Sequence, residues 1–347
     1  MRPKRRFSAR PWILTAALAG ILPAGAVPES GIQLDPGLPE YRPVEGITGT
    51  VHSVGSNKLD VIVFGWIQLL RHYYPSARLT MEARGIYTAA PALIEGSADV
   101  APITIPFTPR EEESFVKKFG YPPLAIRVGG GSFNRNEDGS GAIAVYVNRG
   151  NPIDRLTLAQ LDAIFSTTRK RGAAVDLATW GQLGLTGDWA GRPITIYSGR
   201  LSSSFANAFR YLVLLHGDFK PTIREKARDV EVETLADVVA AVAADPGAIG
   251  FAGFAQTVPA VKTLAIAETE HSPFVAGSLG SVLNRTYPLA RYGYVYVNKP
   301  PGKPLPPAVR EFLLLALSRQ GQQIVGSDGV SLPLPASIVR EELAKFE

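Results

Sequence analysis

Cysteine is absent from this chain of 347 residues. Its absence excludes a disulfide framework, a thiolate metal site, a cysteine nucleophile and a lipid-bearing thiol. Histidine is almost as scarce, and none of the four residues, His52, His72, His216 and His271, shows the paired spacing of a metalloprotease motif. Because His72 and His216 fall within predicted helices, we interpret them as structural residues. We therefore expect no metal site.

The motifs of common enzyme classes are missing as well. The chain has no GxSxG nucleophile elbow and no Walker loop, and the glycines at 129–131 lack the spacing of a dinucleotide fingerprint. The acidic run at 111–113 follows Pro109 and is typical of the solvated first turn of a helix. A triad assembled from distant residues leaves no sequence pattern, and nothing in this chain argues for one. We predict a protein that is not an enzyme and holds no cofactor.

Excess positive charge is confined to one end of the chain. The 36 lysines and arginines outnumber the 31 aspartates and glutamates, which gives a formal charge of +5. The whole excess lies in an acid-free start that contains Arg2, Lys4, Arg5, Arg6 and Arg10. The remaining chain is neutral and lacks the basic surface with which proteins bind nucleic acid, so we predict no such partner. A bound anion would have to be held by local dipoles and one or two charges.

The N-terminal residues have the pattern of an export signal. Residues 12–22 form an apolar run that Pro23 closes, and residues 24–26 (Ala-Gly-Ala) fit the small-x-small rule of signal peptidase. The run is far shorter than the roughly 20 apolar residues of a membrane span. We predict a cleaved signal over residues 1–26 and an unlipidated periplasmic protein without stable membrane insertion. Because residues 5–7 (Arg-Arg-Phe) weakly resemble a twin-arginine signal, the choice between Sec and Tat export stays open.

Predicted strands and helices alternate along most of the remaining chain. Residues 27–47 show no periodicity, so we predict an extended leader, with order beginning near Thr48. Predicted strands lie at 50–54, 78–83, 100–105, 142–148, 194–197 and 248–251, and predicted helices lie at 59–73, 89–95, 205–216, 235–244 and 313–324, with another that begins at Thr157. This alternation is typical of an α/β protein with mainly parallel sheets.

The length and one internal echo indicate two lobes. About 320 residues remain after signal cleavage, more than one core usually serves. The sequence Val-Tyr-Val-Asn occurs at 145–148 and again at 295–298. We interpret the copies as the paired strands of a hinge; the alternative is chance similarity between two apolar strands. The predicted first lobe comprises residues 48–141 and 299–347, and the second comprises residues 142–298.

Three loops that join a strand to a helix carry small polar side chains, at 55–57, 84–88 and 200–204. Such a loop aims backbone N–H groups and the positive end of a helix dipole at one point, which suits an oxyanion. The candidate ligand-binding residues are Ser56, Asn57, Thr88, Thr104, Ser140, Arg200, Ser203 and Ser204. Arg200 is predicted to make the charge-assisted contact, because its planar fork can hold two oxygens. Each loop also fits a plain helix N-cap, and Arg200 also fits a surface residue paired with an acid.

Several segments in one order resemble the phosphate-binding proteins of bacterial ABC transporters. They are ALIEGSADVA at 92–101, AIAVYVNRGNPIDRLTLAQLDAIF at 142–165, TWGQLG at 179–184, the Gly-Arg and Ser-Ser-Ser run within 199–204, and PGAIGF at 246–251. The resemblance implies the type II periplasmic binding protein fold, in which two α/β lobes joined by a two-strand hinge close on a dehydrated oxyanion such as phosphate. It also implies an ABC permease as partner.

The binding loops depart from the pattern of that family. Residues 86–89 read Ile-Tyr-Thr-Ala where the family has a Ser-Gly-Thr-Gly-type turn, and residues 204–206 read Ser-Phe-Ala in place of Ser-Gly-Thr. Residues 103–105 read Ile-Thr-Ile where serines and an arginine are usual, and Lys58 stands where a threonine is common. Because glycine lets the backbone approach a tetrahedral anion closely, these changes remodel the site.

We therefore expect an exported, monomeric solute-binding protein that holds a small oxyanion, phosphate or a related ligand, between its lobes for ABC-type uptake. The alternative is a binding-protein scaffold that has lost or remodelled its ligand site and serves an interaction or surface role. A gain in thermal stability on addition of an oxyanion distinguishes the two, because a ligand that binds only the folded state stabilises it.

Overall fold

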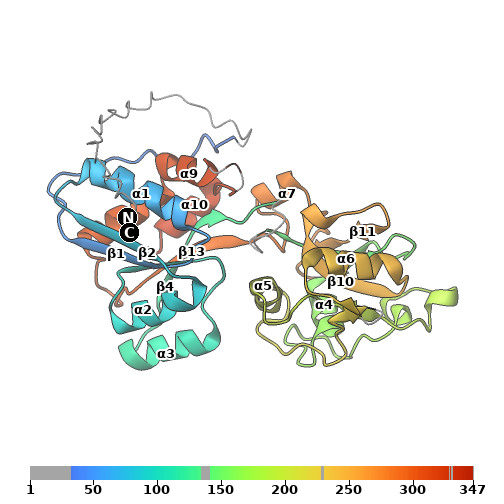
Figure 1. Ribbon diagram of the computed structural model, residues 1–347. Coiled ribbons are helices and arrows are strands. Elements are labelled where there is room, and N and C mark those ends of the chain that lie inside the picture. The colour runs from blue at the N-terminus through green and yellow to red at the C-terminus, as the bar shows by residue number, and fades with distance from the viewer. Residues whose placement is uncertain (1–32, 134–140, 228–229, 328, 330, 347) are drawn as a thin grey trace, which may run out of the picture.

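Two α/β lobes, each built around its own β-sheet, lie side by side in the computed structural model, which describes residues 33–133, 141–227, 230–327, 329 and 331–346 (Figure 1). The first lobe contains segments from the beginning and the end of the chain, and the second contains the middle. The predicted two-lobed α/β architecture is confirmed. No helix within these ranges is long and apolar enough to cross a membrane.

The first lobe holds a five-stranded sheet in the order β2-β1-β3-β13-β4. Strands β1, β2 and β3 are parallel, and β13 runs antiparallel to β3 and β4. The elements of this lobe are β1 (Thr50–Gly55), α1 (Asp60–Tyr73), β2 (Arg78–Ala83), η1 (Ile86–Thr88), α2 (Ala89–Glu95), β3 (Val100–Ile103), α3 (Pro109–Phe119), β4 (Leu124–Gly130), β13 (Tyr292–Val297), α8 (Pro307–Leu317), α9 (Arg319–Gly326) and α10 (Ala336–Leu343).

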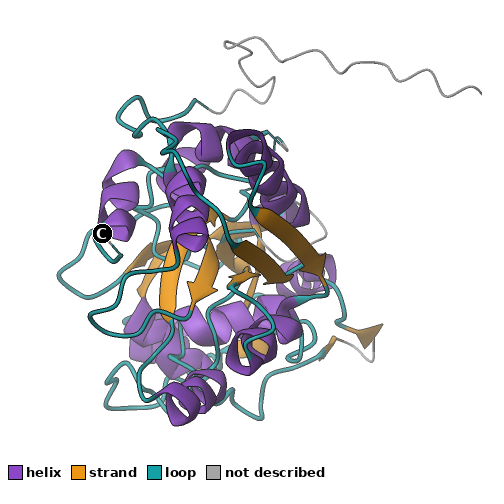
Figure 2. Ribbon diagram, turned by 90° about the vertical axis from the view of Figure 1, so that its left-hand side faces the viewer, coloured by secondary structure: helices purple, strands orange, loops and turns teal. Residues whose placement is uncertain are grey.

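Helices cover both faces of this sheet (Figure 2). On one face α1 and α8 pack together, and the fully buried rings of Trp66 and Phe312 meet edge to face with centroids 5.8 Å apart. On the other face, where α2 and α3 lie, Phe107 stacks on Tyr296 of β13 at 3.8 Å. The inner strand β3 (Val100–Ile103) is buried along its whole length, as expected for a strand covered on both faces.

Local capping signals set the ends of several helices as predicted. Thr108 and Glu111 form a capping box at the start of α3, with Pro109 in the first turn. Gly96 ends α2 in the left-handed conformation, at φ 82°, which glycine adopts at little cost. The predicted helix over 313–324 is wrong in one respect, because Ser318 divides it into α8 and α9. Ser318 has extended backbone angles, and its hydroxyl caps α9 by accepting from the Gly321 N–H at 3.1 Å.

The predicted leader is not a loose extension in its described part, residues 33–47. Leu38 and Tyr41 are buried in the core of the first lobe. The Tyr41 hydroxyl donates to Oε2 of the buried Glu311 at 2.7 Å and lies 2.6 Å from the Tyr74 hydroxyl. Burial, with the Glu311 carboxylate beside it, raises the pKa of Tyr41 far above its usual value. The ordered fold therefore begins before Thr48. The contact that fixes this segment is with a distant part of the chain, so the local sequence does not predict it.

The second lobe holds a four-stranded sheet in the order β11-β5-β10-β7, in which β10 is parallel to β7 and antiparallel to β5. Its elements are β5 (Ile143–Asn148), β6 (Arg155–Thr157), α4 (Leu158–Phe165), η2 (Trp180–Leu183), η3 (Gly187–Trp189), β7 (Thr195–Tyr197), α5 (Ser204–Leu212), β8 (Lys226–Ala227), β9 (Val230–Glu231), α6 (Leu235–Ala244), β10 (Ala248–Gly253), η4 (Phe254–Gln256), β11 (Val261–Thr263), β12 (Ala265–Ala267) and α7 (Leu279–Leu283).

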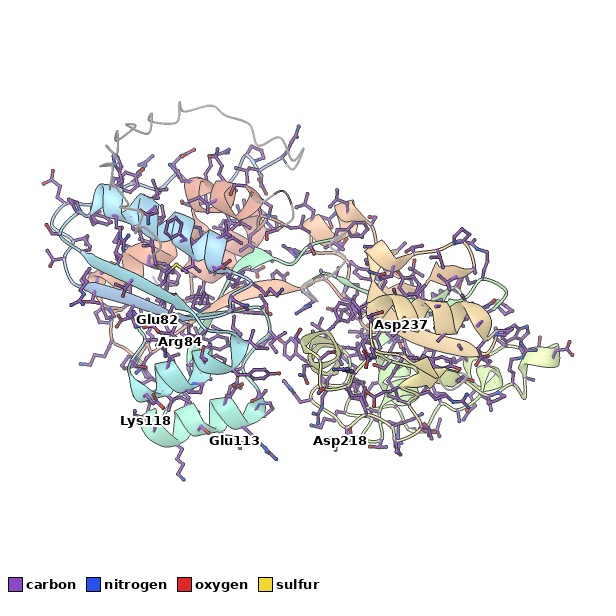
Figure 3. All side chains as sticks on the ribbon, in the orientation of Figure 1. Glu82, Arg84, Glu113, Lys118, Asp218 and Asp237 are labelled. Atoms are coloured by element: carbon purple, nitrogen blue, oxygen red, sulfur yellow. The ribbon has the colours of Figure 1, made fainter. Side chains whose placement is uncertain are left out.

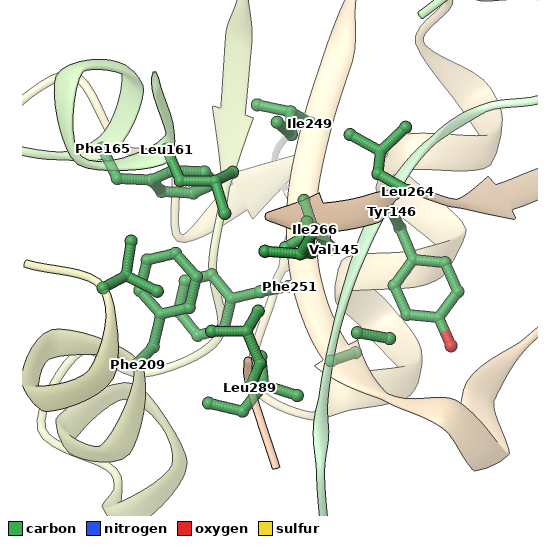
Figure 4. Close-up of a cluster of buried hydrophobic side chains, with 14 of the residues drawn as sticks. Val145, Tyr146, Leu161, Phe165, Phe209, Ile249, Phe251, Leu264, Ile266 and Leu289 are labelled. Atoms are coloured by element: carbon green, nitrogen blue, oxygen red, sulfur yellow. The ribbon is translucent and has the colours of Figure 1, made fainter. Parts of the chain in front are cut away.

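An aromatic cluster forms the centre of the second core (Figure 4). Phe251 of β10 stacks on Phe209 of α5 with centroids 3.9 Å apart, and Phe165 of α4 meets both rings edge to face. The stack fixes α5 against the sheet. Helix α5 ends at Leu212, earlier than predicted, because Leu215 and His216 have positive φ angles of 47° and 58°.

The chain crosses between lobes immediately before β5 and immediately before β13. The two crossing segments are joined by backbone hydrogen bonds from Gly131 N to Arg291 O at 3.0 Å and from Ile143 N to Leu289 O at 3.1 Å. The predicted pairing of the two Val-Tyr-Val-Asn copies is wrong, because β5 belongs to the second sheet and β13 to the first. Each of these strands starts at the hinge and continues into the buried core of one lobe. Its apolar sequence is therefore explained by burial in that core.

We expect Phe251→Ala to lower the free energy of unfolding by about 3–5 kcal/mol, because it removes a ring from the centre of the second core. Val175→Ala, at a side chain that is 59% exposed, should change it by less than about 0.5 kcal/mol. Urea denaturation measures both values. Equal effects of the two substitutions would contradict the packing described above.

Candidate functional site

The predicted site residues follow the carboxyl ends of parallel strands in both lobes. Ser56 follows β1, Thr88 follows β2 and Thr104 follows β3 in the first lobe, and Arg200, Ser203 and Ser204 follow β7 in the second. Open α/β sheets place ligands at these ends, because neighbouring loops diverge there and leave backbone donors exposed. Ser140 lies outside the described residues.

The loop after β1 is tightly packed. Ser56 is 3% exposed; its N–H donates to Pro102 O at 2.8 Å, and its hydroxyl accepts from Lys58 N at 3.1 Å. Gly55 is required here, since a Cβ would lie 2.1 Å from Pro102 O. The Ser56 side chain is thus fixed at the edge of the sheet, whereas Asn57 is exposed.

The loop after β2 leads into a separate cavity of about 390 Å³. Its lining includes His52, Glu82, Arg84 and Thr88, and Glu82 and Arg84 form an ion pair (Figure 3). The Thr88 hydroxyl donates to Gly85 O at 2.8 Å, so it completes its own turn. In this conformation Thr88 supports the loop.

The two lobes meet around a cavity of about 10 Å³, which is room for roughly one water molecule. Thr104, Ile105 and Tyr294 line it from the first lobe, Tyr211 of α5 lines it from the second, and Arg291 lies at the crossing. Burial raises the pKa of Tyr294 well above its usual value, and a hydrogen bond with Tyr211 adds to the rise. An oxyanion can enter this contact only if the lobes move apart.

Arg291 is a buried cation that the sequence analysis missed. It is 4% exposed, its Nη2 donates to Thr104 O at 3.3 Å, and its guanidinium lies 5.9 Å from the ring centroid of Phe205 in α5. It therefore touches both lobes. Beside it, Arg285 Nη1 donates to Arg291 O at 3.0 Å, and burial lowers the pKa of Arg285 to about 10. The only sequence signal was an arginine placed directly before an apolar strand.

Several hydrogen-bond donors of the loop after β7 already have partners within the second lobe. The Arg200 side chain is 64% exposed and its Nη2 lies 2.5 Å from Glu233 Oε1. Leu201 N donates to Glu225 Oε1 at 3.0 Å. Ser203 caps α5 by accepting from Ala206 N at 3.1 Å, and Ser204 is the first residue of that helix. In this conformation Arg200 is therefore a surface residue paired with an acid, which is the second of the two interpretations given above for its sequence.

The predicted residues therefore share one edge of the fold and not one pocket. Thr104 lines the cavity between the lobes; Ser56, Thr88, Arg200, Ser203 and Ser204 do not. Among the described residues, the hydroxyl of Ser198, which is fully buried where β7 ends, is one of the buried polar groups without a hydrogen-bond partner. A shared site would require the loops to approach one another as the lobes rearrange.

Two lobes, a double crossing and hydroxyl-bearing loops at the carboxyl ends of both sheets define the class of two-lobed binding proteins. The model of the PBP superfamily domain matches residues 42–320, and the chain is 38% identical over 346 residues to the phosphate-binding protein PstS of Pseudomonas aeruginosa PAO1. That alignment covers 100% of this chain and 99% of the relative. The chain belongs to the PBP superfamily and, within it, to the family of PstS.

One further relative and two solved structures are also similar to this chain. Protein SphX of Synechococcus elongatus is 28% identical over 209 residues, which cover 59% of this chain and 57% of that protein. The crystal structure of PstS from Borrelia burgdorferi is 14% identical with a TM-score of 0.54, and covers 82% of this chain and 99% of its own. An ABC-type phosphate transport receptor from Vibrio cholerae is 17% identical with a TM-score of 0.50, at 82% and 100% coverage. The two structures support the fold.

We expect Ser203→Ala to lower the free energy of unfolding by about 1 kcal/mol, because it removes the side-chain cap of α5. The neighbouring Ser202 is exposed, so Ser202→Ala is the matched control and should have little effect. Thermal or urea denaturation without ligand measures the difference. If the two variants were equally stable, the capping role of Ser203 would be refuted.

Proposed function

We propose that this chain is a solute-binding protein that holds phosphate or a closely related oxyanion between its two lobes and delivers it to an ABC permease. The observation that carries the proposal is the placement of Ser56, Thr104 and Ser203 after strands of both sheets, in a chain 38% identical over its length to PstS. Residues 1–26 act as the export signal, and the mature protein works as a periplasmic monomer.

The chemistry of the loops supports an oxyanion as ligand. Hydroxyls and backbone N–H groups at helix starts supply partial positive charge without buried ions. Arg200 supplies a planar fork once it leaves Glu233, and the pair is exposed enough for this exchange to cost little. Ser140 and Asn57 are proposed as further donors, and Thr88 joins them when its loop reorganises.

A remodelled scaffold without a ligand is the second candidate. It is favoured by one specific observation: Arg200 and Leu201 N, both in the loop proposed to bind the anion, already interact with Glu233 and Glu225. A protein that had lost its ligand would keep such internal contacts permanently. The two candidates differ in whether any oxyanion stabilises the folded chain.

Titration calorimetry and thermal denaturation of the mature protein with phosphate, sulfate and nitrate test the proposal. We expect phosphate to bind and to raise the melting temperature with increasing concentration, because it binds the folded state alone. A protein that none of the three anions stabilises or binds would instead fit the scaffold.

We expect Arg200→Ala to weaken phosphate binding by at least about tenfold, since a charge-assisted contact is lost. Arg155→Ala is the matched control, because Arg155 is also on the second lobe and its side chain is equally exposed, at 64%. Calorimetry gives the two affinities, and the melting temperatures without ligand verify that both variants fold. Equal affinities of Arg200→Ala and wild type would remove Arg200 from the site.

A further inference from the structure

Two glutamates from one segment meet the loop after β7. Glu225 and Glu233 flank the short hairpin of β8 and β9 and lie on either side of its base. Glu233 Oε1 lies 2.5 Å from Arg200 Nη2, and Glu225 Oε1 accepts from Leu201 N at 3.0 Å. The carboxylate oxygens therefore occupy a guanidinium donor and a backbone donor of the same loop.

Backbone contacts hold this segment against β7. Arg224 N donates to Ile196 O at 2.8 Å, and Ser198 N donates to Arg224 O at 3.2 Å. Val232 N donates to Glu225 O at 2.8 Å and closes the base of the hairpin. A Cβ on Gly199 would lie 3.3 Å from Glu233 O, so the two backbones approach closely. The positions of both glutamates are thus set by main-chain pairing as well as by their side-chain contacts.

We propose that Glu225 and Glu233 determine the anion affinity and selectivity of this loop by competing with the ligand for its donors. The proposal rests on the proposed function, since it concerns the same site. Each carboxylate is a singly charged oxyanion that the chain itself supplies. A ligand that binds the loop must displace both, and it must also overcome the repulsion of the charges it displaces.

The exposure of the pair makes this competition reversible. The side chains of Arg200 and Glu233 are 64% and 53% exposed, and exposed ion pairs contribute little to stability because water screens them. A singly charged anion interacts with these donors no more strongly than a carboxylate does. A doubly charged oxyanion interacts more strongly with the same donors, so the loop favours phosphate over nitrate or acetate.

The test compares Glu225→Gln, Glu233→Gln and the double variant with wild type, by calorimetry with inorganic phosphate and with nitrate. Each single substitution should tighten phosphate binding by about tenfold, as removal of one charge a few ångströms from the ligand does near a protein surface. The double variant should tighten phosphate binding more than nitrate binding, because the two removed charges repel a doubly charged anion more strongly than a singly charged one. A purely structural role of the glutamates would leave the ratio of the two affinities unchanged.

Glu270→Gln is the control for a general change in charge. Glu270 is also exposed on the second lobe, and it lines a different cavity, with Lys170 and His271. The phosphate affinity of the Glu270→Gln variant should stay within about twofold of that of wild type. Melting temperatures without ligand establish that all variants fold.

The outcomes separate this proposal from the proposed function. If wild type binds phosphate and the glutamine variants bind it equally well, the competition is refuted and the function stands. If wild type binds no oxyanion but the double variant binds phosphate, the glutamates hold the site closed and the proposal is supported. If neither protein binds phosphate or nitrate, both proposals are overturned.

Discussion

Two backbone hydrogen bonds, from Gly131 N to Arg291 O and from Ile143 N to Leu289 O, hold the two crossing segments of the chain together. They join the two places where the chain passes between the lobes, so both sheets are connected through this one line of crossing. Arg291 lies on that line, and its guanidinium reaches Thr104 O and the ring of Phe205 for this reason. The loops after β1, β3 and β7 follow the carboxyl ends of strands, where open α/β sheets place ligands.

Local sequence signals sufficed where a few neighbouring residues decide the structure. Strand β2 has its predicted bounds, and α2 ends at Gly96 as predicted, because the left-handed C-terminal residue is a property of glycine itself. The start of α4 at Thr157 was predictable for a similar reason, since its hydroxyl and Gln160 form a capping box. The strand-loop-helix placement of the candidate site residues was therefore accessible from sequence.

The remaining features depend on contacts between residues far apart in the chain. Tyr41 is fixed by Glu311, 270 positions away, and no pattern near residue 41 encodes that carboxylate. Arg200 pairs with Glu233 across a hairpin, so the choice between a ligand contact and a surface ion pair could not be made from the Gly-Arg motif. Arg291 was missed because burial of an arginine at a crossing becomes visible only when both lobes are assembled.

The central claim is that the loops of both lobes converge on one oxyanion. A crystal structure of the mature protein grown with arsenate, an analogue of phosphate whose arsenic scatters anomalously, tests it most directly. We expect one anomalous peak between the lobes, within hydrogen-bonding distance of donors after β1 or β3 in the first lobe and of donors after β7 in the second. A peak bound by one lobe alone, or no peak while the Arg200–Glu233 pair persists, would contradict it.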